Sequence, residues 1–304
     1  MITWVVGAGG LFGSAIVRQT DNMFQSKKIH WQSHEQALRD LAQNAQQFSA
    51  AAGDKDWAVI WAAGNASTSS SAIETHRELE SLSALVDALV EYQPSGQGVF
   101  FLTSSAGGVY AGSSNPPFST LTIPHPLSPY GELKLAQELV VSNRLLGVCD
   151  VVIGRVANLY GPGQNLEKLQ GLLSRLALSS ITKTPLSIFV SLDTMRDYIY
   201  SDDAARIALH WIRKYSGMKT NTPQIKIITS GQPVSIGYLI HLMQEIARTK
   251  TPISYGSHSS SSAQARDLRL MPSGQEEVEG FLQTPLPAGT KSIYLDILDR
   301  YQTA

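Results

Sequence analysis

The sequence contains a single cysteine, no long apolar run and almost no net charge. Because Cys149 has no second cysteine to pair with, an intramolecular disulfide framework and a cysteine-based zinc or iron–sulfur site are excluded, and a reducing cytoplasm is the expected compartment. The 24 basic and 25 acidic residues give a net charge of −1, which provides no basic field for nucleic acid. No apolar stretch approaches the roughly 18 residues that a membrane-spanning helix needs, and residues 1–10 lack the features of a signal peptide. We therefore expect no metal, nucleic-acid or membrane partner.

The apolar residues make up 43% of the chain against 16% charged, which is enough for a sizeable core. In the first two thirds, short β-branched runs alternate with longer helical stretches. This order predicts an α/β protein with a Rossmann-like, doubly wound parallel sheet covered by helices on both faces. The expected strands are 2–6, 28–31, 57–62, 99–103 and 150–155, and the expected helices are 11–20, 35–48, 74–92 and 130–146.

After the fifth expected strand, loops rich in Gly, Pro and Ser separate shorter elements. The clearest of these elements are helices at 202–215 and 235–248 and a strand at 225–228. We expect residues 1–160 to form mainly a first lobe and 161–304 mainly a smaller second one. The two lobes should form a single intertwined unit, because no Pro/Gly/Ser-rich tether separates them.

A glycine-rich turn, Gly7-Ala8-Gly9-Gly10-Leu11-Phe12-Gly13, follows the first expected strand and opens the first helix. Glycine suits such a turn because the backbone turns tightly and approaches a pyrophosphate closely, and the last glycine lets helix and strand pack together. Glycines spaced three apart are a weak signal alone, but their position after a buried strand strengthens it. The turn predicts that the first lobe binds a dinucleotide.

The end of the second expected strand bears on the choice between NAD and NADP. An acidic residue there would hold the adenosine ribose of NAD. The chain instead reads Trp31-Gln32-Ser33-His34, and Glu35 comes only where the next helix is expected to begin. No arginine is obviously placed to bind the 2′-phosphate of NADP. The cofactor is expected to be NAD or NADP, and the choice stays open.

Tyr130 and Lys134 lie four residues apart, on one face of an expected helix. A cation beside a phenol favours the phenolate, so Tyr130 is a candidate acid and base for a substrate hydroxyl, while Lys134 could also hold the nicotinamide ribose. Two serines follow the fourth expected strand, where open α/β sheets bind their ligands. Ser105 is the preferred partner of Tyr130, and Ser104 is the alternative.

Several motifs follow one another along the chain: the glycine turn at 7–13, Ser-Ser-Ala-Gly-Gly-Val-Tyr at 104–110, Pro-Leu-Ser-Pro-Tyr-Gly-Glu-Leu-Lys at 126–134, Arg-Val-Ala-Asn-Leu-Tyr-Gly-Pro-Gly at 155–163 and Arg-Asp-Tyr-Ile-Tyr-Ser-Asp-Asp at 196–203. In this order they resemble the extended short-chain dehydrogenase/reductase family, the NAD-dependent epimerase/dehydratases that act on nucleotide-linked sugars. The resemblance covers most of residues 1–250. It implies a Rossmann-like nucleotide-binding lobe and a small C-terminal lobe that holds the nucleotide-sugar.

The resemblance also implies roles at matching positions and a homodimer formed through the helices at 74–92 and 130–146. The residues it makes catalytic are Ser105, Tyr130 and Lys134. The residues expected to contact substrate are Ser104, Asn158 and Arg196, the last through the substrate phosphates. The residues expected to contact the dinucleotide are Gly7, Gly10, Leu11, Phe12, Gly13, Ser33, Ala62, Ala63, Gly64, Thr103, Tyr130, Lys134 and Val156.

Departures from the family pattern reduce the number of reactions that the chain is expected to catalyse. Family dehydratases carry an Asp-Glu pair after the serine, whereas this chain has Ala106 and two glycines, which cannot move a proton, so dehydration is disfavoured. The epimerase–reductases that make fucose nucleotides use a cysteine beside the serine, but Cys149 lies far along the chain. Measured back from Val109-Tyr110, the commonest serine position falls on Ala106, which leaves the choice between the two serines open.

Two reactions remain. A 4-epimerase would use Tyr130 as base while hydride leaves the sugar C4 for NAD and returns to the other face. A 4-keto reductase would use NADPH once, with Tyr130 as proton donor. The epimerase is preferred narrowly because it is commoner in the family, although the missing acid after the second strand favours the reductase. The further alternatives are a non-catalytic dinucleotide-binding regulator and an enzyme of the same fold acting on a non-nucleotide carbonyl compound.

Overall fold

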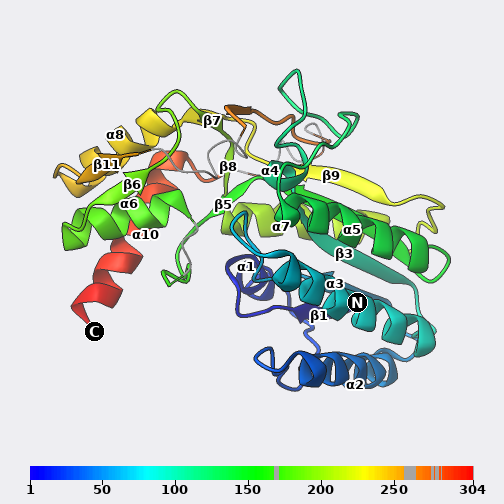
Figure 1. Ribbon diagram of the computed structural model, residues 1–304. Helices are drawn as coiled ribbons and strands as arrows, with labels where there is room; N and C mark the ends of the chain where they lie inside the picture. Colours follow the sequence, from blue (N-terminus) through cyan, green and yellow to red (C-terminus); the bar gives the residue numbers. More distant parts are fainter. Residues whose placement is uncertain (168–170, 257–264, 275–276, 278–280, 282, 304) are drawn as a thin grey trace.

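The computed structural model describes residues 1–303 apart from 168–170, 257–264, 275–276, 278–280 and 282, and it has two unequal lobes (Figure 1). The larger lobe is built on a five-stranded parallel sheet. In spatial order its strands are β1 (Ile2–Val6), β2 (Trp57–Trp61), β3 (Gly98–Ser105), β4 (Asp150–Val156) and β9 (Gln224–Ile228). The expectation of an α/β protein with a central parallel sheet is confirmed.

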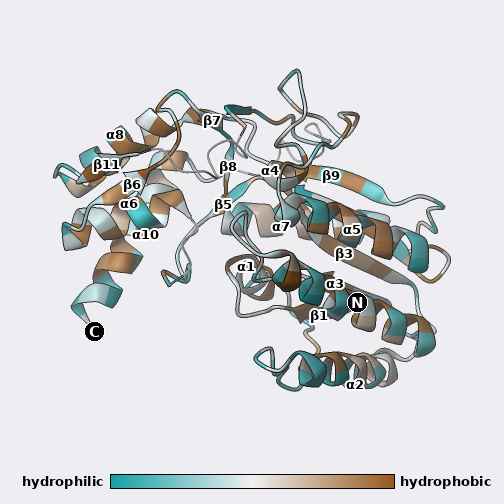
Figure 2. Ribbon diagram, in the orientation of Figure 1, coloured by the Kyte–Doolittle hydropathy of each residue, from teal (hydrophilic) through white to brown (hydrophobic). Residues whose placement is uncertain are grey.

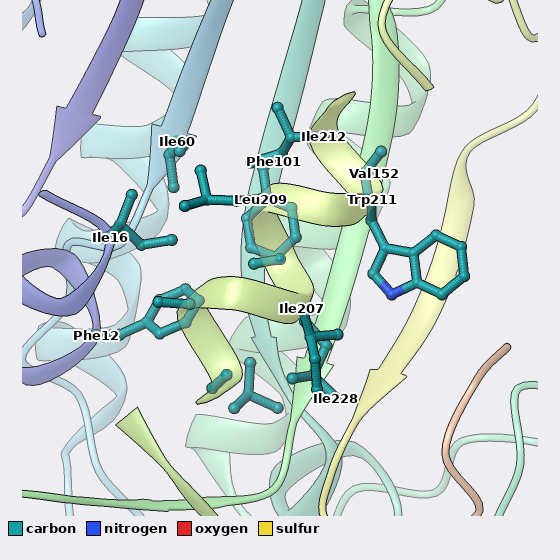
Figure 3. Packing of buried hydrophobic residues seen from close by; sticks show 14 of the residues in the cluster. Phe12, Ile16, Ile60, Phe101, Val152, Ile207, Leu209, Trp211, Ile212 and Ile228 are labelled. Atoms are coloured by element: carbon teal, nitrogen blue, oxygen red, sulfur yellow. The ribbon is translucent and has the colours of Figure 1, made fainter. Parts of the chain in front are cut away.

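Helices cover both faces of this sheet, so the larger lobe has three layers. On one face lie α1 (Leu11–Val17), which ends three residues earlier than expected, and α7 (Ser201–Tyr215). Figure 3 shows Phe12 of α1 and Leu209 of α7 packed toward Phe101 of the sheet.

The opposite face of the sheet is covered by α2 (His34–Ala52), α3 (Ala72–Glu91) and α5 (Pro129–Arg144). Neighbouring residues of β2 alternate between the two cores, as a strand buried on both faces requires: Val59 packs on this side and Ile60 on the other. Figure 2 shows β3 in brown and α5 with both teal and brown residues, which is the pattern of a buried strand beneath an amphipathic helix.

The expected strand at 28–31 is wrong, since the segment has no strand structure. Side chains of α2 bind its backbone instead of a neighbouring strand: Asn44 Oδ1 accepts from Lys27 N (2.8 Å), and Asp40 Oδ2 accepts from His30 N (2.9 Å). The hydrogen bond from the His30 backbone foremost, followed by those from the side chains of Gln36 and His30, lowers the pKa of Asp40 to about 2. β1 is the outermost strand of the five-stranded sheet and pairs with β2 on its inner side.

The smaller lobe packs α6 (Leu172–Thr182), α8 (Ile236–Ala247) and α10 (Leu286–Gln302) around the parallel strand pair β6 (Leu186–Ile188) and β11 (Ile253–Tyr255). Between the lobes lie β5 (Asn158–Tyr160), β7 (Met195–Arg196), β8 (Tyr198–Tyr200), β10 (Val234–Ser235), β12 (Asp267–Leu268) and the single-turn helix α4 (Ala106–Val109). The chain crosses between lobes more than once, because α7 and β9 return to the large sheet after α6. Within the described residues, no helix is long and apolar enough to cross a bilayer.

Candidate active site

A cleft of about 1250 Å³ lies where the carboxyl ends of the parallel strands meet the smaller lobe. Gly7, Thr103 and Tyr130 line it from the larger lobe, and Arg175 and Phe189 from the smaller one. Open parallel sheets bind ligands at this edge. Pockets for a single drug-sized ligand measure about 300–1,000 Å³, so this cleft has room for more than one such ligand.

The glycine turn forms one end of the cleft. Gly7 has a φ of +92°, and a Cβ there would lie 2.5 Å from the backbone nitrogen of Ala63. A Cβ on Gly13 would lie 2.2 Å from Gly7 O, so this glycine lets α1 start directly against the turn. Gly10 precedes α1 with an ordinary φ of −79° and no side-chain cap, and leaves the amides of the first turn facing the cleft.

Gly10→Val is expected to weaken dinucleotide binding strongly without unfolding the protein. A Cβ at Gly10 meets only Gly7 O at 3.4 Å and Ala62 O at 4.0 Å, so the branched side chain fits the fold but fills the cleft. We expect the dissociation constant of the dinucleotide to rise by about 100-fold, the equivalent of two lost charge-assisted hydrogen bonds of about 1.5 kcal/mol. Isothermal titration calorimetry measures this, and unchanged affinity would refute the assignment of the turn. Gly13→Ala is the contrasting variant, which should instead lower the unfolding temperature.

The predicted adenosine side of the cleft is only partly as expected. Ala62, Ala63 and Gly64 follow β2 and line the cleft. Ser33 directly precedes α2 without a side-chain capping hydrogen bond, and the cleft is lined by the residues on either side of it, not by Ser33. Trp31, which the sequence did not single out, also lines the cleft, and its side chain is 45% exposed.

Tyr130 lies in the cleft at the start of α5, with its ring against α4. A Cβ on Gly108 would come within 3.0 Å of Tyr130 Cε1, so glycine at 108 lets the ring pack there. Ser105 Oγ accepts from Gly108 N (3.1 Å) and so keeps its own O–H for a ligand. Ser104 is 3% exposed and donates its hydroxyl to Glu138 Oε1 (2.6 Å). This geometry favours Ser105 over Ser104 as the partner of Tyr130.

Lys134 lies behind Tyr130, and its ammonium is not among the groups that line the cleft. Lys134 Nζ is 5.5 Å from the centroid of the Tyr130 ring. It donates to Gln137 Oε1 (2.9 Å) and to Glu78 Oε1 (3.3 Å). Glu78 comes from α3 and itself lines the cleft, so a carboxylate that the sequence analysis missed stands beside the predicted catalytic pair.

A buried network supports the floor of the site. Arg155 of β4 donates to both carboxylate oxygens of Glu138 on α5, at 3.0 and 2.7 Å, and also to Tyr110 Oη. Burial opposes the charge of Arg155, but the hydrogen bonds and the charge of Glu138 outweigh it and raise the pKa of the guanidinium. Through Ser104, this network is tied to the end of β3 beside Ser105, the predicted catalytic serine.

The predicted substrate contacts line the other end of the cleft. Arg196 of β7 is only 8% exposed, and its guanidinium donates to Met195 O (2.8 Å). Burial lowers its pKa despite the nearby Tyr198 and Asp267, and no described carboxylate hydrogen-bonds it. A cation buried in this way is stabilised by an anionic ligand. Asn158 also lines the cleft and donates its amide to Asp197 O (2.9 Å), and Val156 lines it at the end of β4.

Thr103 and the first residues of α1 complete the predicted set. Thr103, Leu11 and Phe12 line the cleft, whereas Gly13 is packed beneath the turn. The lining residues that the prediction did not name include Trp31, Glu78, Arg175 and Phe189. No short motif marks these four residues, because each reaches the cleft through the fold and from a different element.

Cys149 lies just before β4, at the opposite end of that strand from the cleft. Burial raises the pKa of its thiol to about 12, so it is an inert small side chain. Among the described residues, no group of three or more His, Cys, Asp or Glu side chains could hold a metal ion.

Comparisons with known proteins agree with this geometry. Residues 3–227 match the profile described as the NAD dependent epimerase/dehydratase family. The dTDP-4-dehydro-6-deoxyglucose reductase of Escherichia coli is 28% identical over 155 residues, which make up 50% of this chain and 47% of the relative. The match therefore spans about half the length of that relative.

Solved structures share the fold over the full chain. A UDP-glucose 4-epimerase from Thermotoga maritima, solved with UDP-glucose, has a TM-score of 0.79 and 21% identity over 100% of both chains. A UDP-glucose 4-epimerase from Thermus thermophilus, solved with NAD, also has a TM-score of 0.79, with 18% identity over 100% of both chains. At such identities these likenesses concern the Rossmann-like fold.

Proposed function

Because the chain belongs to the NAD dependent epimerase/dehydratase family, we propose that it transfers hydride between a nicotinamide dinucleotide and C4 of a nucleotide-linked sugar. The observation that carries the proposal is the placement of Tyr130 and the glycine turn in one cleft with the buried cation Arg196. A dinucleotide and a diphosphate-linked sugar would fill the two ends of that cleft.

The residues present fit a dinucleotide. Gly7 and Gly13 leave no room for a Cβ because the backbone of the turn is packed against Ala62–Ala63 and against α1, while the space at Gly10 is open. The amides there can bind a pyrophosphate. The dinucleotide, when bound, supplies or accepts the hydride. The turn, Ala62, Ala63 and Gly64 would hold it, with Trp31 as a flat apolar surface for the adenine.

The protein residues would handle the proton and the orientation of the sugar. Tyr130 Oη would give or take the proton of the C4 oxygen, and Ser105 would hydrogen-bond the same oxygen from the other side. Arg196 would bind the substrate phosphates by a charge-assisted fork, which would also neutralise its buried charge. Asn158 would contact the sugar or the diphosphate with its carboxamide oxygen.

Epimerisation and reduction both use these residues. The preference for a 4-epimerase rests on the family and on the epimerases that share the fold. One observation favours the 4-keto reductase: the E. coli relative that matches at 28% identity carries the name of a nucleotide-4-keto-sugar reductase.

Recovery of the nucleotide from denatured protein tests the proposal and separates the two reactions. A near-stoichiometric amount of NAD, identified by mass, would indicate a cofactor regenerated in each cycle and therefore an epimerase. An empty protein that oxidises NADPH or NADH when given a nucleotide-4-keto-sugar would indicate the reductase. A protein that binds no dinucleotide would contradict both.

A further inference from the structure

The contacts of Glu78 bring a negative charge to the predicted catalytic pair. Glu78 Oε1 accepts from Lys134 Nζ (3.3 Å) and from Gln137 Nε2 (3.3 Å). Glu78 Oε2 accepts from the backbone amides of Asn65 and Ala66, at 2.9 and 3.0 Å. The side chains of Lys134 and Glu78 are only 8% and 10% exposed. One buried carboxylate thus joins the lysine to the loop after β2 that lines the cleft.

The local backbone makes room for this carboxylate. Gly64 directly precedes the two amides that bind Glu78, and a Cβ on Gly64 would lie 2.7 Å from Glu78 Oε1. Any larger residue at 64 would push Glu78 away from Lys134. The contact therefore depends on a glycine in the loop as well as on the helix that carries Glu78.

The other charged groups near Tyr130 and Lys134 either bind other residues or are exposed to solvent. On α3, Glu74 caps its own helix through Ser71, and Arg77 is exposed to solvent. On α5, Glu138 is paired with Arg155 of β4, and Tyr110 beyond α4 binds that same arginine. The balance of charge behind Tyr130 is therefore set mainly by Lys134 and Glu78, which cancel each other.

We propose that Glu78 is a positioning residue that holds Lys134 beside Tyr130 and offsets its charge, and that this arrangement suits the site to reducing a 4-keto group. This inference rests on the proposed hydride transfer at C4, and of the two proposed reactions it supports the 4-keto reductase over the 4-epimerase. A site that begins by oxidising a sugar hydroxyl needs the ionised phenol as base, and an unopposed lysine would favour that form. A carboxylate paired with the lysine opposes that effect, and reduction of a ketone requires a phenol that can donate its proton.

The proposed reduction takes a hydride from the dinucleotide and a proton from Tyr130. The keto carbon receives hydride, with both electrons, from the reduced nicotinamide, which becomes oxidised. The keto oxygen takes the proton from Tyr130 Oη as that O–H bond breaks, and the product is the alcohol. The phenolate left behind regains its proton from water.

The test is the ionisation of Tyr130 in the whole protein, observed by NMR of ¹³C-labelled tyrosine and assigned by its absence in Tyr130→Phe. In Glu78→Gln the charge of Lys134 is unopposed, so the ionisation should move about one pH unit lower. The alkaline fall in kcat for NADPH-dependent ketone reduction should move with it, while KM for the nucleotide-sugar changes little. Glu78→Asp, which keeps the charge, should restore the native titration.

A matched control and an opposite variant complete the experiment. Glu80→Gln removes a carboxylate two residues along α3 that binds His34, and it should leave the titration unchanged. Lys134→Gln leaves Glu78 unopposed and should move the ionisation of Tyr130 to higher pH, which tests the coupling if Glu78→Gln does not fold. A titration that is the same in Glu78→Gln and in the native protein would overturn the inference. Because the titration needs no substrate, a shift without any turnover would instead contradict the proposed function alone.

Discussion

Tyr130→Phe is expected to lower turnover by about 100- to 10,000-fold, the usual contribution of a positioned proton donor. The substitution removes only the hydroxyl. The ring keeps its contact with Gly108, because the glycine has no Cβ to displace it. The dissociation constant of the dinucleotide should therefore stay within about 2-fold of the native value. Steady-state kinetics with a nucleotide-4-keto-sugar and calorimetry with NADPH provide the two measurements.

The exposed Tyr301 of α10 is a suitable control for Tyr130→Phe, since its side chain is 57% exposed. Tyr301→Phe removes the same hydroxyl and should leave both turnover and binding unchanged. Near-native turnover in Tyr130→Phe would end the assignment of Tyr130 as the group that moves the proton. Loss of dinucleotide binding in the same variant would show that the phenol holds the cofactor and would leave its chemical role undecided.

The parts of the fold that could be predicted are those determined by local pattern. The run that forms β2 is apolar over its whole length, and β3 is apolar from Val99 to Leu102, as is typical of buried parallel strands. The glycine turn was recognisable from the spacing of its glycines and from its place directly after an apolar strand. The strand expected at 28–31 was wrong because Asp40 and Asn44 of α2 bind the backbone of His30 and of the neighbouring Lys27. These contacts form only once α2 is packed beside the segment, and the composition of the segment does not show them.

In the site, too, local sequence patterns could be predicted and contacts between distant residues could not. The i, i+4 spacing of Tyr130 and Lys134 was visible in the chain, but the partner of Lys134 was not, because Glu78 is 56 residues away and meets it only through the packing of α3 on α5. The choice between the two serines also needed the structure. Ser104 and Ser105 point to opposite sides of β3 as strand neighbours must, and only the fold shows that one side holds Glu138.

Glu138→Gln is expected to lower the free energy of unfolding by a large amount. The side chains of Arg155 and Glu138 are 5% and 8% exposed, so a neutral residue at 138 leaves a buried guanidinium without its counter-charge. Removing one partner of a buried ion pair costs about 3–5 kcal/mol, a large part of the roughly 5–15 kcal/mol by which domains are stable. Urea unfolding followed by circular dichroism measures the loss as a lower midpoint at unchanged slope.

Two comparisons distinguish loss of the ion pair from a general sensitivity of α5. Glu132 lies on the same helix and is exposed, so Glu132→Gln should change the free energy of unfolding by no more than about 0.5 kcal/mol. Arg155→Met combined with Glu138→Leu removes both charges and should recover most of the stability, because apolar residues of similar volume often replace a buried pair without cost. The double variant should still lose activity, since Ser104 and Tyr110 would lose the partners that hold the end of β3 beside Ser105. Full stability in Glu138→Gln would mean that the network contributes nothing to the fold and is retained for the site alone.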